Sequence, residues 1–343
     1  MSDTLNRQLV LIARPDANVG PEHFEMRRST VPALEAGQAL VRVHWLGIDA
    51  TQRTWLNERE TYTSPARIGS VMPGSGVGQV VASRSELFKV GDWVVGPTGW
   101  QDYALAAGEG LHGFTRIPEG IEPRAMLSVF GVNGLTAYFG MTEIAKPLEG
   151  ETVFVSAAAG GVGSIAGQIA RKLGARVIGS AGGERKCAWA RDVARFDACI
   201  DYRAEDMRER LGALAPDGID VVFDNVGGAT LEAALDHIAP HARVVLCGSI
   251  SSGYRNDAYG RGPSNYMQLA FKRARMEGFI FLDFVAQFPQ ALYRMLAWVQ
   301  AGDIRYEETI SPGLETAPAA LAGLFEGRNL GKHLVQVCSS QSD

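Results

Sequence analysis

The stretch VFVSAAAGGVGSIAGQIARKLGARVIGSAGGERK, which runs from Val153 to Lys186, decides the fold of this chain. An apolar run leads into a cluster of glycines, a helical pattern extends from Val162 to Leu173, and a second apolar run follows. A strand, a glycine-rich turn and a helix in this order form a dinucleotide site, because glycines let the backbone approach a pyrophosphate at the helix N-terminus. Ala157 replaces the first glycine of the usual motif, so the prediction rests on this context. The expected cofactor turn consists of Gly160, Gly161, Val162 and Gly163.

The end of the second apolar run indicates which dinucleotide binds. Sites for NAD usually place an acidic residue there, about 20 residues after the glycines, to hold the ribose 2′-hydroxyl. Here the sequence reads IGSAGGERK, without an acid at Gly179 or Ser180 and with Arg185 and Lys186 within reach of a 2′-phosphate. The pattern therefore predicts NADPH. The alternative for Lys186 is a solvated charge on the first turn of the next helix.

The rest of the chain divides into two kinds of sequence. From residue 151 onward, six apolar runs alternate with helical patterns, and the last run is MEGFIFLDF. This rhythm predicts an α/β fold with a doubly wound parallel sheet. Up to about Tyr103, short apolar runs are interrupted by Gly and Pro, which predicts a small β-barrel or sandwich. Between the two parts, residues 126–145 are expected to form helical segments interrupted by Gly131 and Gly134.

Composition excludes several classes of function. The formal net charge is −5, and no run of Lys and Arg interleaves with aromatic residues, so we expect no nucleic-acid partner. No stretch approaches about 18 consecutive apolar residues, and the N-terminus lacks a signal-peptide pattern, so we expect no membrane partner and a cytoplasmic location. The four cysteines form no CxxC pair and are expected to be buried thiols.

Four motifs, AAAGGVGS, DNVGG, RMEGF and NLGK, occur in the order found in one known family. The chain resembles the zinc-independent medium-chain dehydrogenase/reductases, and within them the NADPH-dependent alkenal/enone reductase group. The resemblance implies a GroES-like β-barrel catalytic and substrate domain at 1–125 and 310–343 and a Rossmann NADPH-binding domain at 126–309. It also implies a homodimer that pairs through the edge strand MEGFIFLDF.

The resemblance assigns further residues to the cofactor. In the family, a Lys after the second strand and a Tyr after the third hold the 2′-phosphate, which here implies Lys186 and Tyr202. Tyr202 has the alternative of capping a strand, and the Asn of the DNVGG motif has the alternative of shaping its turn. The other residues implied by the resemblance are Asn225, Cys247, Gly248, Ser249, Phe279 and Asn329.

Zinc-dependent relatives of this family place a Cys and a His-Glu pair where this chain has Asp49 and Ser75-Gly76. No cysteine precedes Cys187, so the structural zinc loop is also missing. Tetrahedral zinc requires three or four closely arranged Cys, His or carboxylate ligands. We therefore expect no metal, and hydride transfer to the β-carbon of an α,β-unsaturated aldehyde or ketone as the reaction.

The expected substrate pocket departs from the family pattern. A pocket tyrosine in the family motif DPYMR is replaced by Thr51, and a second tyrosine, four residues before the RMxxF arginine, is replaced by Phe271. Tyr266 and Thr51 are therefore the candidates for catalytic hydroxyls, with packing or a surface position as the alternative for Tyr266. Trp55 and Tyr62 are candidates for the pocket wall beside Phe271, although Trp55 could simply pack on the barrel.

Two other functions fit the same sequence. A quinone reductase would share the zinc-free architecture, and its product would be a hydroquinone instead of a saturated ketone. A noncatalytic NADPH-binding protein would explain the loss of two tyrosines, and it would bind NADPH without turning over enones or quinones.

Overall fold

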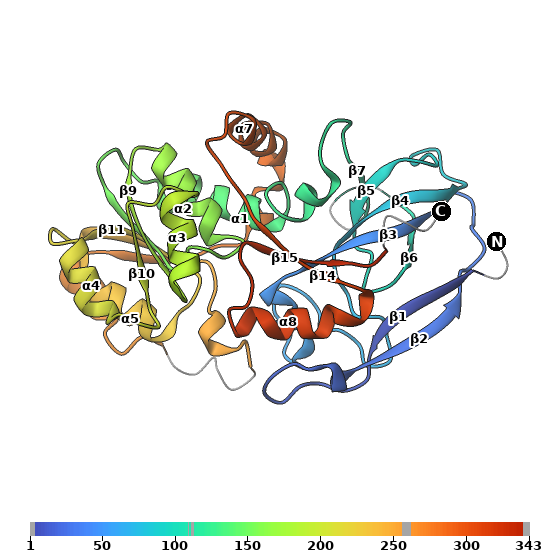
Figure 1. Cartoon of the computed structure of the whole chain (residues 1–343), viewed down its shortest axis with the longest axis horizontal. Helices are drawn as coiled ribbons and strands as arrows, with labels where there is room; N and C mark the ends of the chain where they lie inside the picture. The colour runs from blue at the N-terminus through green and yellow to red at the C-terminus, as the bar shows by residue number, and fades with distance from the viewer. Residues whose placement is uncertain (1–3, 109, 111–112, 256–261, 339–343) are drawn as a thin grey trace. The chain divides into compact units, whose positions relative to one another are not determined.

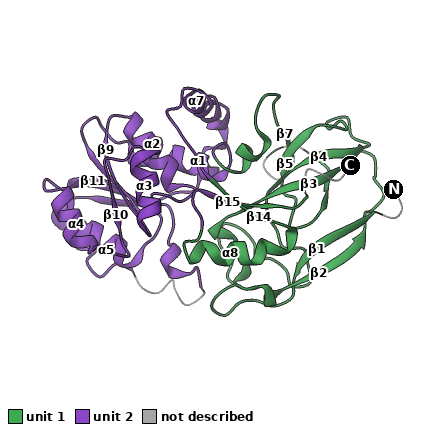
Figure 2. Cartoon of the chain, in the orientation of Figure 1, with its two compact units in different colours: residues 1–128, 308–328, 333–343 green, residues 129–307, 329–332 purple. Residues whose placement is uncertain are grey.

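The computed structural model describes residues 4–108, 110, 113–255 and 262–338, so part of the loop between Tyr254 and Tyr266 lies outside the described residues. The chain forms two compact units (Figure 2). Unit 1 comprises Met1–Ser128, Glu308–Arg328 and His333–Asp343. Unit 2 comprises Val129–Glu307 and Asn329–Lys332, so the chain passes between the units four times.

Unit 2 is built on a parallel sheet of six strands in the order β10-β9-β8-β11-β12-β13. Figure 1 labels three of them, β9, β10 and β11. Every pair of neighbours in this sheet is parallel. The order reverses between β8 and β11, as in a Rossmann fold, so the predicted doubly wound sheet is confirmed. Apolar residues that are fully buried, such as Phe154, Ile178 and Val222, form its core. The strands are β8 (Thr152–Val155), β9 (Arg176–Ala181), β10 (Ala198–Asp201), β11 (Ile219–Asp224), β12 (Ile238–Leu246) and β13 (Arg275–Gly278).

Helices connect these strands, as parallel pairing requires. The helix after the glycine turn, α2, has eight buried residues from Gly163 to Ala170 and leaves only its basic end exposed. In the described part of unit 2 the helices are α1 (Val132–Phe139), α2 (Gly163–Lys172), α3 (Glu184–Asp192), α4 (Met207–Leu214), α5 (Gly228–Asp236), α6 (Gln268–Lys272) and α7 (Phe288–Gln300), with a π-helix η4 (Gly140–Ala145) and two 3₁₀ turns, η5 (Ile250–Ser252) and η7 (Phe281–Gln287).

Gly134 does not interrupt the helix as the sequence suggested, because it lies inside α1. A Cβ atom at this position would lie 1.7 Å from the carbonyl oxygen of Val129. Close approach of the preceding chain therefore requires glycine here, and the low helix propensity of glycine is overridden by packing.

The strand predicted for MEGFIFLDF is shorter than expected. β13 pairs with β12 from Arg275 to Gly278, and the following residues turn into η7. The aromatic side chains explain this end of the strand, because Phe284 stacks on Phe139 of α1 at 4.7 Å between ring centroids and Phe281 stacks on Phe288 at 5.8 Å. The apolar run thus fills the space beside α1 and does not extend the sheet.

Unit 1 contains a seven-stranded sheet, in which β3 is flanked by β4 and β15 and also pairs with β6, and a two-stranded sheet, β1-β2. Its buried core includes Leu46, Phe88 and Trp100, with residues of helix α8 (Ala317–Phe325) packed against them. The strands are β1 (Leu5–Leu11), β2 (Phe24–Thr30), β3 (Ala39–Ile48), β4 (Gly76–Ser83), β5 (Trp93–Gly96), β6 (Tyr103–Ala106), β7 (Thr115–Arg116), β14 (Glu308–Pro312) and β15 (Lys332–Gln336). The short 3₁₀ helices of this unit are η1 (Pro21–His23), η2 (Ala50–Leu56), η3 (Pro123–Leu127) and η8 (Leu314–Thr316).

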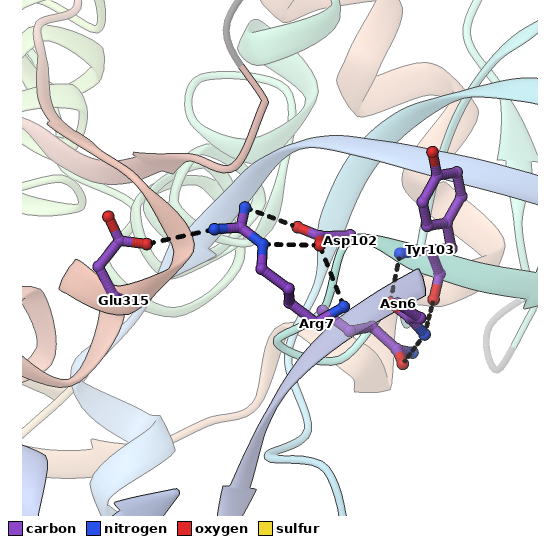
Figure 3. Close-up of polar contacts among 6 residues, drawn as sticks. Asn6, Arg7, Asp102, Tyr103 and Glu315 are labelled. Carbon is purple, nitrogen blue, oxygen red and sulfur yellow. Dashed lines mark hydrogen bonds and ion pairs between the residues drawn. The ribbon is translucent and has the colours of Figure 1, made fainter. Parts of the chain in front are cut away.

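Polar contacts hold β1 on the segment that enters β6 (Figure 3). Arg7 donates two side-chain hydrogen bonds to Asp102, at 2.9 and 3.0 Å, and Glu315 lies 3.7 Å from the same guanidinium. Asn6 exchanges hydrogen bonds with the backbone of Tyr103, at 3.1 and 3.0 Å. The paired fork of an arginine on a carboxylate fixes direction as well as distance, so it orients the first strand of the chain.

Within the described residues, no helix is long and apolar enough to cross a membrane.

Candidate functional site

The loops at the carboxyl ends of β8 and β11 lie at the point where the strand order of the parallel sheet reverses. In doubly wound sheets the connections on either side of this switch point run in opposite directions, and ligands bind there. The predicted cofactor turn follows β8, and the DNVGG motif follows β11. The fold therefore brings two of the predicted motifs to the same edge of the sheet.

The glycine turn is as tight as the motif requires. A Cβ atom on Gly163, the first residue of α2, would lie 2.3 Å from the carbonyl oxygen of Ala157. Ala157 itself has a left-handed backbone, with φ of 52°, at the place where the usual motif has its first glycine. The turn keeps the shape of a glycine-rich loop at the cost of some backbone strain in Ala157. Its N–H groups at the start of α2 can bind a pyrophosphate.

The NLGK segment lies against this turn. The N–H of Gly331 donates to the carbonyl of Ala159 at 2.8 Å, and Gly331 forms a parallel bridge with Gly160. The side-chain amide of Asn329 donates to the carbonyl of Gly331 at 2.7 Å. The segment that contains Asn329 is therefore held beside the glycine turn by the contact between Gly331 and Ala159, which are far apart in the sequence.

Asn225 and the loop after β12 are also joined to β8. The side chain of Asn225 donates to the carbonyl of Ser156 at 2.8 Å, which supports the alternative that it shapes its loop. The N–H groups of Cys247 and Gly248 donate to the carbonyl of Asp224 at 2.9 and 3.1 Å. Three loops that the sequence assigns to the cofactor, those after β8, β11 and β12, thus share one hydrogen-bond network.

A second cluster forms where β9 and β10 end. One carboxylate oxygen of Asp201 accepts from the N–H of Gly183 at 2.8 Å and from the N–H of Arg203 at 3.0 Å. This contact joins the turn before α3 to the turn after β10. A Cβ atom on Gly182 would lie 2.5 Å from the Tyr202 hydroxyl and 2.9 Å from Nε of Arg203, so both side chains pack over this glycine.

Lys186 lies in the same cluster. Burial lowers the pKa of its ammonium group, and the positive charges of Arg203 and Arg185 lower the pKa further. A bound anion would counter this effect, because a nearby negative charge favours the protonated form of the lysine. The cluster therefore fits a phosphate group, and it includes Arg203, which the sequence reasoning missed. The signal for Arg203 was present, since it directly follows the predicted phosphate ligand Tyr202.

Tyr254 is a second residue that the sequence reasoning missed. Its hydroxyl accepts a hydrogen bond from the N–H of Ser249 at 2.9 Å. A Cβ atom on Gly248 would lie 2.8 Å from the same hydroxyl, so the phenolic oxygen of Tyr254 packs against the loop after β12. The backbone at Gly253 and Tyr254 is left-handed, which turns the chain back toward this loop. The sequence SSGYR contains the glycine that permits this turn.

Two other predicted cofactor residues have different surroundings. The rings of Phe279 and Phe223 both pack against Gly140 of η4. A Cβ atom placed on Gly140 would lie 2.7 Å from the Phe279 ring and 2.6 Å from the Phe223 ring. Desolvation raises the pKa of the Cys247 thiol to about 12, with a further contribution from the Asp224 carboxylate. Cys187 and Cys199 are buried, as expected, whereas Cys247 and Cys338 are partly exposed.

In unit 1, the structure brings Thr51 and Tyr62 together through a hydrogen bond between their hydroxyl groups. Thr51 lies in η2, and Tyr62 is 55% exposed. Trp55 packs on the core of unit 1, which agrees with its alternative role as a packing residue.

In unit 2, Tyr266 precedes α6 and Phe271 lies within it, and both are mostly exposed, at 60% and 68%. A surface position, one of the alternatives for Tyr266, is what its exposure favours.

The positions that hold zinc ligands in metal-dependent relatives have other roles. Asp49 precedes η2, and its N–H donates to Gln52 at 3.1 Å. The described residues contain no group of three or more His, Cys, Asp or Glu side chains that could hold a metal ion.

Comparison with known proteins places the chain in a family. Residues 7–114 match the family model described as the N-terminal domain of oxidoreductase, and residues 161–299 match the model described as zinc-binding dehydrogenase. The chain is 39% identical to the NADPH-dependent curcumin reductase of Escherichia coli over 97% of both chains. The chain belongs to the zinc-independent medium-chain dehydrogenase/reductases. This membership confirms the family resemblance found in the motifs.

Other members of the medium-chain reductases give the same result. Prostaglandin reductase 1 of Bos taurus is 36% identical over 91% of this chain and 93% of its own length. The crystal structure of CurA from Vibrio vulnificus in complex with NADPH is 40% identical, has a TM-score of 0.91, and covers 97% of this chain and 99% of that one. The predicted fold class is therefore supported by a solved relative as well as by the strand order.

Proposed function

We propose that this medium-chain reductase reduces the carbon–carbon double bond of α,β-unsaturated aldehydes or ketones with NADPH, without a metal. The observation that carries the proposal is its similarity, over nearly the whole chain, to reductases named for NADPH and for such substrates. Beside the curcumin and prostaglandin reductases, these include a 2-alkenal reductase of Nicotiana tabacum, which is 37% identical over 88% of this chain. The phosphate-binding features of unit 2 support the same cofactor.

The residues of unit 2 fit NADPH by their chemistry. The N–H groups of the glycine turn would hold the pyrophosphate, and Lys186, Tyr202 and Arg203 would hold the 2′-phosphate through charge and hydrogen bonds. Asn225, Asn329 and the loop from Cys247 to Ser249 would line the nicotinamide half, and Phe279 would support it. When bound, the cofactor supplies the hydride.

Unit 1 would supply the substrate side of the reaction. Donors aimed at the substrate carbonyl stabilise the negative charge that develops on its oxygen after hydride arrives at the β-carbon. The hydrogen-bonded hydroxyls of Thr51 and Tyr62 are suited to this role, with Trp55 as a candidate for an apolar wall. Phe271 belongs to unit 2 and stays a prediction from sequence. We therefore assign substrate binding to the domain at 1–125 and 310–343 and NADPH binding to the domain at 126–309. A cytoplasmic location stays a prediction.

A screen of NADPH oxidation with enals, enones and quinones tests the proposed function. We expect turnover of enals or enones, with a saturated aldehyde or ketone as the product identified by mass spectrometry. Turnover restricted to quinones, with hydroquinone formed, would make the chain a quinone reductase. Tight NADPH binding without turnover of any compound would instead indicate a noncatalytic protein.

Lys186→Ala tests the phosphate site. Loss of a charged hydrogen bond costs about 1.5–3 kcal/mol, so we expect NADPH binding to weaken roughly 10- to 100-fold and NADH binding to stay nearly unchanged. Lys172→Ala is a matched control, because Lys172 pairs with Asp303 at 2.6 Å on an exposed surface of the same unit. Equal losses for both cofactors in Lys186→Ala would show that Lys186 does not recognise the phosphate.

The identity of the catalytic hydroxyl is tested by comparing two tyrosines. Tyr266 and Thr51 stay the candidates from sequence, and the contact of Tyr254 with the loop from Gly248 to Ser249 makes Tyr254 the stronger of the two tyrosines. We expect Tyr254→Phe to lower kcat for an enone about 100- to 1000-fold, as loss of a donor to a developing oxyanion does. Loss of its hydrogen bond to Ser249 should weaken NADPH binding by less than about tenfold. We expect less than about a threefold change in kcat for Tyr266→Phe. The reverse order would assign the role to Tyr266.

We also propose a homodimer that forms along β13. This strand is at the edge of its sheet, and bare edges tend to pair. Exposed apolar side chains lie close to it in the sequence, including Met267 and Phe271. Light scattering at micromolar concentration should give twice the chain mass of 36.9 kDa, whereas a mass equal to one chain would refute the dimer.

A further inference from the structure

A buried carboxylate lies at the switch point of the parallel sheet. Asp224 is the last residue of β11 and is 1% exposed. One of its oxygens accepts hydrogen bonds from the Ser156 hydroxyl at 2.8 Å, from the N–H of Val226 at 3.0 Å and from the N–H of Gly227 at 3.1 Å. The other oxygen accepts from the same N–H of Gly227 at 2.9 Å. These four contacts come from donors, so the site fits an ionised carboxylate, which can only accept.

The same residue connects three loops. Ser156, which donates to Asp224, follows β8 and accepts from the N–H of Asn225 at 2.8 Å. The carbonyl of Asp224 accepts from the first two N–H groups after β12, those of Cys247 and Gly248. Asp224 therefore fixes the loops after β8, β11 and β12 with its side chain and its backbone together.

A carboxylate in such a position is costly to bury. Desolvation raises the pKa of Asp224 above its ordinary value, and the hydrogen bonds from Gly227, Val226 and Ser156 offset only part of this rise. Removing a carboxylate from water is expensive unless hydrogen bonds replace the water. An asparagine of the same shape would direct an N–H group toward one of the donors that surround this site. The arrangement of the loops therefore depends on the charge and not only on the volume of the side chain.

We propose that Asp224 is a positioning residue for the nicotinamide half of the cofactor. The inference rests on the proposed function, because that function assigns the loops it holds to the nicotinamide and pyrophosphate. The adenosine end is organised separately by Asp201, which joins the turns that carry Lys186, Tyr202 and Arg203. Loss of the Asp224 carboxylate should therefore weaken binding of the whole dinucleotide but not of its adenosine part.

Asp224→Asn tests this division by calorimetry with two probes, NADP⁺ and adenosine 2′-monophosphate. An amide NH2 in place of a carboxylate oxygen would face the N–H of Gly227, and this opposed pair of donors should weaken NADP⁺ binding about 10- to 100-fold. Binding of adenosine 2′-monophosphate should change less than about threefold, because that probe lacks the 5′-phosphate and requires only the cluster at the ends of β9 and β10. A uniformly destabilised domain would lose affinity for both probes, so the split separates positioning from a general structural role.

Asp220→Asn is the matched control. Asp220 lies on the same strand, and its carboxylate accepts from the N–H of Thr152 in β8 at 2.9 Å, near the opposite end of the strand. We expect both probes to bind the control as they bind the unchanged chain. Equal weakening of both probes by Asp224→Asn, or no weakening of either, would overturn the proposal.

Ser156→Ala provides a second variant if Asp224→Asn does not fold. It removes one donor to Asp224 and the acceptor of the Asn225 N–H, and it leaves the carboxylate in place. NADP⁺ binding should weaken about 3- to 30-fold with binding of adenosine 2′-monophosphate unchanged, and a variant that binds both probes normally would overturn the proposal. Failure of the unchanged chain to bind adenosine 2′-monophosphate would instead overturn the proposed function, and the inference with it.

Discussion

The hydrogen bond between Ser156 and Asp224 continues the pairing of β8 and β11 beyond the point where the two backbones separate. The parallel ladder between these strands ends at Val155 and Phe223, and the N–H of Ser156 makes its last backbone contact with Phe223 at 3.1 Å. Beyond this point the two strands are joined by the side chains of Ser156 and Asp224, because the two loops leave the sheet in different directions. The loops after β8, β11 and β12 are connected to this contact directly or through one intermediate residue.

Features that depend on local sequence could be predicted. The glycine turn and α2 follow from a short pattern of apolar and glycine residues, and the order of six apolar runs predicted the parallel sheet. The residues Lys186 and Tyr202 were expected at the 2′-phosphate from the resemblance, and the structure places Tyr202 and Lys186 in one cluster with Arg203. In each case the geometry is set by the end of a strand, which the sequence marks clearly.

Features that depend on tertiary packing could not be predicted. Gly134 reads as a helix breaker until the carbonyl of Val129 is placed beside it, and FIFLDF reads as a strand until its rings are seen to stack beside α1. The roles of Asp201, Asp224 and Tyr254 come from contacts with backbone groups of other loops. The pattern of apolar and polar residues does not predict such contacts, because they form in loops, where that pattern no longer follows a helix or a strand.

The four passages of the chain between its units have a consequence for how the protein forms during synthesis. In unit 2, the glycine turn makes its contact with Gly331. In unit 1, β3 pairs with β15, which begins at the residue after Gly331. Neither unit is therefore complete until residues 331–336 have left the ribosome. Contacts between residues so distant in sequence form slowly, and a nascent chain exposes apolar strands while it waits for them. Truncation near the C-terminus would leave both units unfinished at once, so incomplete chains should be easily recognised by chaperones and proteases.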